Sequence, residues 1–109
     1  MTYEIDDKIG RTDSRDIVRT TAMTVTTTPS LLPATPLGRR NYIAVKNMSG
    51  ANNVAITTAS GLNYAGGYPV GVSGAEWSVF TDGVLYIVAA AATADVRVFE
   101  RAERFNYKK

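Results

Sequence analysis

The chain has 109 residues, of which 45% are hydrophobic and 20% charged, and its formal net charge is +2. This length fits one domain with a single hydrophobic core. The sequence contains no cysteine and no histidine. It therefore lacks disulfides, thiolate catalysis, cysteine zinc sites, and the commonest general base and metal ligand. We expect a protein that is not an enzyme and that uses no metal and no cofactor.

The charged residues gather at the two ends of the chain. Nine of the 22 lie in residues 1–19 and six in residues 100–109, which leaves seven for the residues between. We expect the ends to be solvated arms around a sparsely charged domain. The predicted boundaries are an N-terminal arm, a β domain and a basic C-terminal tail, at residues 1–17, 18–101 and 102–109.

No segment is predicted to enter a membrane. The first 30 residues lack the apolar stretch of a signal peptide. The longest apolar run, residues 84–92, has nine residues, whereas a membrane helix needs about 20. We expect the protein to be made and kept in the cytoplasm unless it leaves as part of an assembly.

The N-terminal arm carries isolated apolar residues and no sustained periodicity. Two interpretations stay open. The arm is a disordered terminus, or it orders against a neighbouring subunit with Tyr3, Ile5 and Ile9 as its anchors.

The first predicted strand covers residues 18–28, which are rich in β-branched side chains. Met23 and Val25 are expected to face the core, with the neighbouring threonines in water. Residues 29–38 contain three prolines and predict an extended connection pinned by leucines.

The chain is organised around residues 39–58, which predict two paired strands with a turn between them. Ile43 and Val45 alternate with polar or smaller residues, and Val54 and Ile56 continue the apolar set after the turn. Glycine and asparagine supply the turn because both tolerate positive φ.

The rest of the domain adds more strands. Residues 59–74 hold five glycines and predict a crossover between two sheets; no P-loop ending follows them. Residues 75–81 form a strand with Trp77 and Val79 on one face. An Asp-Gly hairpin turn then leads into a central, wholly apolar strand over residues 84–90. The last strand covers residues 94–101. About six short strands with turns between them predict an antiparallel β-sandwich or a small barrel.

The aromatic residues allow two interpretations. They form a stacking platform for a sugar or a single-stranded nucleic acid, or they fill the core and an interface. These residues are Tyr42, Tyr64, Tyr68, Trp77 and Tyr86. Few basic residues lie among them, so we expect no nucleic-acid partner. The domain's predicted acids, Glu76, Asp82 and Asp95, are not expected to form a catalytic carboxylate pair.

The order of these features resembles small bacteriophage virion proteins of the head-decoration or cement type. The resemblance covers about residues 20–101. The segments that carry it are Val25-Thr26-Thr27-Thr28, Gly38-Arg39-Arg40, Val45-Lys46-Asn47, Asn53-Val54-Ala55-Ile56-Thr57, Gly67-Tyr68-Pro69-Val70, Leu85-Tyr86-Ile87-Val88-Ala89-Ala90 and Thr93-Ala94-Asp95-Val96-Arg97-Val98.

The resemblance implies a jelly-roll-like β-sandwich of six to eight strands with an extended N-terminal arm. It also implies a virion protein that binds the outer surface of the capsid at subunit junctions, as a homodimer or homotrimer on the major capsid protein. Arginine and tyrosine are common interface anchors. The resemblance does not cover the N-terminal arm, and the contact residues are predicted from residue type: Tyr3, Ile5, Ile9, Arg11, Arg15, Arg39, Arg40, Tyr64, Tyr68 and Pro69.

Two alternatives stay open beside capsid decoration. One is a carbohydrate-binding module of a phage tail or head fibre, which would use Tyr64, Tyr68 and Trp77. The other is a tail or neck adaptor, which would bind by the same physics with a different symmetry.

Overall fold

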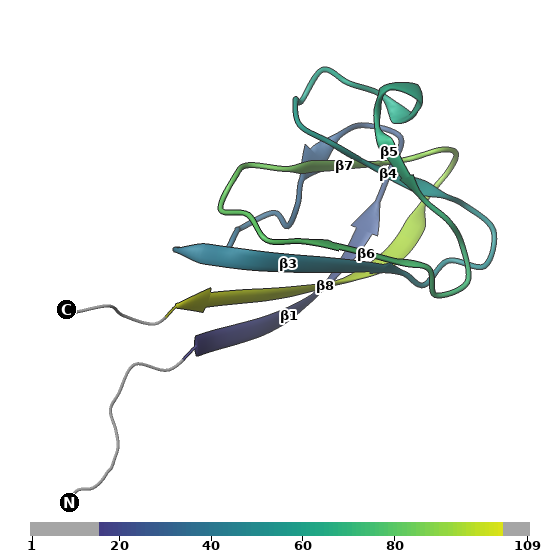
Figure 1. Cartoon of the computed structure of the whole chain (residues 1–109). Coiled ribbons are helices and arrows are strands. Elements are labelled where there is room, and N and C mark those ends of the chain that lie inside the picture. The colour runs from purple at the N-terminus through teal and green to yellow at the C-terminus, as the bar shows by residue number, and fades with distance from the viewer. Residues whose placement is uncertain (1–15, 104–109) are drawn as a thin grey trace, which may run out of the picture.

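The computed structural model describes residues 16–103, which form two four-stranded antiparallel sheets with no α-helix among them (Figure 1). The first sheet has the order β1-β8-β3-β6 and the second the order β2-β7-β4-β5. The strands are β1 (Asp16–Val25), β2 (Ser30–Leu31), β3 (Arg40–Asn47), β4 (Val54–Thr57), β5 (Tyr68–Val70), β6 (Glu76–Val79), β7 (Tyr86–Ala89) and β8 (Ala94–Glu103). A short 3-10 helix, η1 (Tyr64–Gly66), precedes β5.

The strand order is that of a jelly roll. β1 pairs with β8, β2 with β7, β3 with β6, and β4 with β5, so the chain is one long antiparallel ribbon that folds over itself. Successive pairs alternate between the two sheets. The prediction of an antiparallel, jelly-roll-like sandwich is confirmed.

The core lies between the two sheets and consists of small and β-branched side chains. In β3 and β8 the inward residues Ile43, Val45, Val96 and Val98 are fully buried, as strand alternation predicts. In the second sheet the central strand β7 is buried on both faces, which agrees with its apolar sequence. Met23, Trp77 and Val79 pack against this core from the edge strands.

The predicted pairing of the two strands in residues 39–58 is wrong. β3 and β4 belong to different sheets, and the turn between them carries the chain across the sandwich. The Asp82–Gly83 segment is likewise a crossover from β6 to β7 rather than a hairpin turn. Turn residues indicate where a chain reverses, but they do not say which sheet the next strand joins.

The structure also corrects the segments predicted as connections. β2 lies inside the proline-rich stretch, where it pairs with β7. The glycine-rich stretch stays in the second sheet from β4 to β5, and only residues 71–75 cross to the first sheet. Gly67 packs so closely on β4 that an added Cβ would lie 2.7 Å from the Cβ of Ala55.

The strands extend two residues beyond the predicted domain at each end, because β1 begins at Asp16 and β8 ends at Glu103. The rest of the predicted N-terminal arm and C-terminal tail lies outside the described residues. Among the described residues, no helix has the length and apolar character needed to span a membrane.

Candidate interaction surface and a buried charge network

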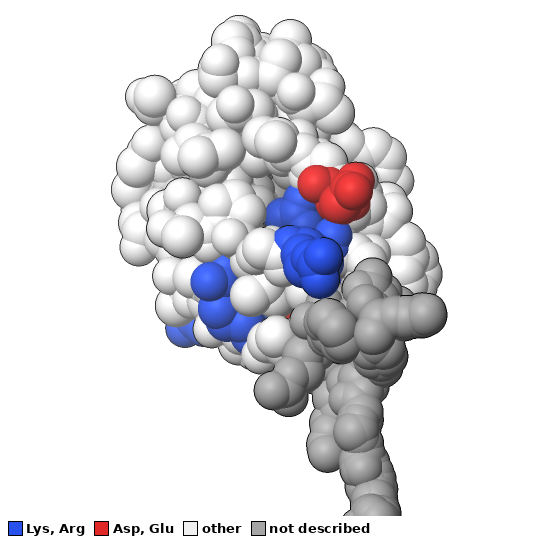
Figure 2. Space-filling view, turned by 90° about the vertical axis from the view of Figure 1, so that its left-hand side faces the viewer, with Lys and Arg blue, Asp and Glu red and all other residues white. Residues whose placement is uncertain are grey.

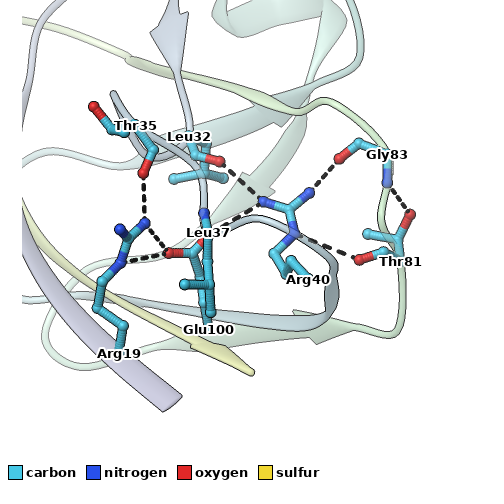
Figure 3. Close-up of polar contacts among 8 residues, drawn as sticks. All are labelled: Arg19, Leu32, Thr35, Leu37, Arg40, Thr81, Gly83 and Glu100. Atoms are coloured by element: carbon cyan, nitrogen blue, oxygen red, sulfur yellow. Dashed lines mark hydrogen bonds and ion pairs between the residues drawn. The ribbon is translucent and has the colours of Figure 1, made fainter. Parts of the chain in front are cut away.

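One end of the sandwich is held by a buried carboxylate. Glu100 on β8 is fully buried, and its inward position follows from the alternation that buries Val96 and Val98. The expectation that Glu100 belongs to a solvated arm is therefore wrong. A buried carboxylate requires partners, and Figure 3 shows that two arginines and a backbone amide supply them.

The partners of Glu100 come from three segments. Arg19 on β1 donates from Nη2 to Oε1 at 2.6 Å, and the Leu37 amide donates to Oε2 at 3.0 Å. Arg40 at the start of β3 places Nη1 3.5 Å from Oε2. Arg19 also donates to the Thr35 carbonyl at 2.5 Å. The network therefore fastens the connection between β2 and β3 to the first sheet.

Arg40 continues the network toward the second connection. Its side chain is only 4% exposed, and it donates to the carbonyl oxygens of Leu32, Thr81 and Gly83. The register of β3 against β8 shifts between Arg40 and Tyr42, which indicates a β-bulge. The bulge turns Arg40 inward although regular alternation would place it beside Tyr42 on the outer face. Arg40 was predicted as a contact residue, but its guanidinium is buried and binds groups of its own chain.

The outer face of the first sheet carries an aromatic patch, defined here as Tyr42, Phe80, Phe99 and Arg101. The Tyr42 ring centroid lies 4.9 Å from that of Phe80 and 6.3 Å from that of Phe99. The guanidinium carbon of Arg101 lies 5.6 Å from the Tyr42 centroid and 5.8 Å from the Phe80 centroid. These contacts are typical of cation–π packing.

The aromatic patch is open to solvent. Phe80 is 73% exposed and Phe99 39% exposed. Val18 on β1, also 57% exposed, stands opposite Arg101 in the strand register and continues the apolar surface. An exposed cluster of large apolar groups beside an arginine is typical of a protein contact surface. From the sequence, Tyr42 was expected either in a stacking platform or in the core and an interface, and no role was predicted for Phe80 or Phe99.

Basic side chains lie at the end of the sandwich where β1 and β3 begin and β8 ends. Figure 2 views this end and shows the basic side chains in two neighbouring groups, one of them beside a smaller acidic group, with uncharged surface above them. Arg39 is exposed here, with a φ of 60° in the turn before β3. Its predicted role as a contact residue stays a prediction.

Among the predicted contact residues that the structure describes, Tyr64, Tyr68 and Pro69 lie away from Arg39. Tyr68 and Pro69 lie on β5, which Figure 1 shows on the far side of the sandwich from the start of β3. Tyr68 is 62% exposed, with its ring centroid 6.4 Å from that of Trp77. The hydroxyl of Tyr64 accepts a hydrogen bond from Asn53 at 3.3 Å. Five predicted contact residues lie outside the described residues: Tyr3, Ile5, Ile9, Arg11 and Arg15.

Within residues 16–103, no three acidic side chains lie close enough together to hold a metal ion. Asp95 pairs with Arg97 at 2.6 Å on the outer face of β8. Glu76 is exposed on β6, and Asp82 lies in the crossover after it. Comparisons of the chain with protein-family models, curated proteins and solved structures find no match.

Proposed function

We propose that this protein is a structural component of a bacteriophage virion that binds the outer surface of the capsid at subunit junctions and stabilises the shell. The observation that carries the proposal is the exposed aromatic patch on a rigid sheet. Jelly rolls occur in viral capsid proteins and in lectins, so the fold alone does not choose a function. The resemblance of the sequence to decoration proteins favours the capsid.

The aromatic patch suits contact with another folded protein. The Tyr42 ring already contacts the rings of Phe80 and Phe99, so these side chains have less freedom to lose when a partner covers them. The exposed Arg39, in the turn before β3, favours an acidic or carbonyl-rich partner surface. The proposed partner is the major capsid protein.

The proposed mechanism is mass action. A protein that binds the assembled shell but not its free subunits stabilises the shell by its binding free energy. Many symmetric copies add their contributions, so each contact need only be modest. No catalytic step is part of this proposal.

Binding to shells that lack this protein tests the proposal. Purified protein is mixed with such shells and sedimented, and the bound fraction is measured against concentration. We expect saturable binding, and Phe80→Ser should weaken it about tenfold or more because a central aromatic anchor contributes more than about 1.4 kcal/mol. Met48→Ser is the matched control, since Met48 is also an exposed apolar residue but follows the other end of β3.

The two measurements test the proposed function and the proposed contact surface separately. If the unaltered protein does not bind shells, the proposed function is wrong. If Phe80→Ser binds as tightly as Met48→Ser, a different surface makes the contact.

Carbohydrate binding on a tail or head fibre is the second candidate function. The contact between Tyr68 and Trp77 favours it, since paired rings form a stacking platform for sugars. However, Trp77 faces inward and packs against the core, which leaves Tyr68 as the exposed ring. A saturable change in tryptophan fluorescence on titration with host glycans would support this candidate over the first.

A further inference from the structure

The first strand presents a long free edge. β1 pairs with β8 along ten residues, from Asp16 opposite Glu103 to Val25 opposite Ala94. Within residues 16–103, β1 stands at the end of its sheet and no strand pairs with its other side (Figure 1). Its outer edge therefore offers a row of backbone donors and acceptors to a further strand.

The other edge strands are protected in ways that β1 is not. β2 has two residues, β6 has four, and β5 has three with Pro69 in the middle. Short length and proline are the usual means by which proteins block pairing at a sheet edge. β1 has ten residues, no proline and no glycine, and its continuous register against β8 shows no bulge.

The charged side chain of Arg19 does not block pairing at this edge. Arg19 lies near the middle of β1, where a basic side chain ordinarily discourages pairing. Its guanidinium is turned to Glu100 and to the Thr35 carbonyl instead. The residues around it are β-branched or small, and threonine and valine pair well across strands.

We infer that β1 pairs antiparallel with β1 of a second copy of this chain across a two-fold axis. Side chains that stand opposite each other in an antiparallel pair lie on the same face of the sheet. Val18, Thr20, Ala22 and Thr24 are exposed on the outer face, whereas the residues between them point inward. A two-fold axis perpendicular to the sheet keeps the outer faces of both copies on the same side. Outward-facing residues must then stand opposite outward-facing residues, which requires that the residue at the axis stands opposite its own copy. Of the residues that could stand at the centre, Thr20 and Thr21 keep almost the whole of β1 paired, so the central pair is Thr20 with Thr20 or Thr21 with Thr21.

Neither register brings like charges together. With Thr20 at the centre, Arg19 stands opposite Thr21; with Thr21 at the centre, it stands opposite Met23. The product is one continuous eight-stranded sheet that carries both aromatic patches on the same outer face. A partner surface would then meet two linked copies of the patch, which raises the overall affinity. The pairing itself does not depend on the proposed function.

The absence of cysteine from the sequence makes a direct test simple. Single-cysteine variants Thr20→Cys and Thr21→Cys of the full chain are oxidised mildly and analysed for disulfide-linked dimers. Opposed residues have Cα atoms about 4.5–5.5 Å apart, within the range of a disulfide. Ser78→Cys, exposed on the opposite edge strand β6, is the matched control.

We expect the unaltered chain to sediment as a dimer at micromolar concentration, and one of the two β1 variants to cross-link while Ser78→Cys does not. Thr20→Lys should weaken the dimer at least tenfold, because the two lysines stand directly opposite each other in the Thr20 register and diagonally across the central pair in the Thr21 register. Ser78→Lys should leave the dimer unchanged. Circular dichroism shows that each variant is folded. A monomer at all concentrations, or a dimer that cross-links only through Ser78→Cys, overturns the inference. A monomer that dimerises after deletion of residues 1–15 also overturns it, because the chain's own segment then covers the edge.

Discussion

The carboxylate of Glu100 lies 3.5 Å from the guanidinium of Arg40, and both side chains are buried at the same end of the sandwich. Arg40 requires this carboxylate, because a buried guanidinium without a counter-charge would lose its hydration without compensation, whereas Glu100 also pairs with Arg19. Arg40 also reaches carbonyl groups of the connections that follow β2 and β6. The pair therefore closes one end of the jelly roll and shapes the surface beside the aromatic patch.

Glu100→Gln tests this role. The variant keeps the size of the side chain but leaves the buried Arg40 without a counter-charge, so we expect the free energy of unfolding to fall by about 3–5 kcal/mol. Urea denaturation followed by circular dichroism measures the loss. Glu76→Gln makes the same chemical change at an exposed site on β6 and should stay within about 0.5 kcal/mol. Equal effects at the two sites would contradict a special role for Glu100.

The other end of β3 is organised by Asn47, which is fully buried. Its side-chain amide donates to the Asn52 carbonyl at 3.0 Å, and its Oδ1 accepts from the Ser49 amide at 2.9 Å. Asn47→Ala leaves these groups without partners and should reduce the free energy of unfolding by about 2–3 kcal/mol. In contrast, Asn53→Ala, at an exposed site, should cost less than about 1 kcal/mol in the same denaturation experiment. A smaller loss of stability for Asn47→Ala than for Asn53→Ala would contradict the structural role of the Asn47 hydrogen bonds.

Gly67 has no room for a side chain. An added Cβ would lie 2.7 Å from the Cβ of Ala55 and 2.8 Å from Cγ2 of Thr57, both on the buried strand β4. Gly67→Ala should therefore lower the thermal midpoint and reduce the free energy of unfolding by about 1–3 kcal/mol. Gly61→Ala is the control, since nothing lies within 4 Å of its added Cβ. Calorimetry that finds the two variants equally stable would contradict the close packing of Gly67 on β4.

Removal of the N-terminal segment tests the predicted arm. The deletion should end at residue 15, because Asp16 and Ile17 pair with Glu103 and Ala102 in the sheet. If the arm anchors the protein to the shell, deletion of residues 1–15 abolishes shell binding and leaves the β-type circular dichroism intact. Shell binding that survives the deletion would show that the arm is not an anchor.

Most of the sheet framework could be predicted from the sequence, because alternation and burial are coupled along each strand. Met23, Val25, Val96 and Val98 face inward as predicted, and β7 is central. The strands β2 and β5 were missed because two or three residues are too few to show alternation. The crossovers from β3 to β4 and from β6 to β7 were missed because turn residues do not specify which sheet the next strand joins.

The network around Glu100 could have been predicted only in part. Alternation through Val96 and Val98 points Glu100 inward, but its charge and its position near the end of the chain favour solvent. The decisive partner, Arg40, is turned inward by a bulge that no sequence pattern marks. The aromatic patch joins residues from three separate strand regions, so it became visible only once the strand order was known.

The number of copies of this protein in each virion tests the central claim most directly. Quantitative mass spectrometry of purified virions of the phage that the proposed function implies gives the molar ratio to the major capsid protein. Decoration of the shell predicts a ratio that matches the repeat of the capsid lattice. A handful of copies would place the protein in the tail or neck, and its absence from virions would contradict the proposed function.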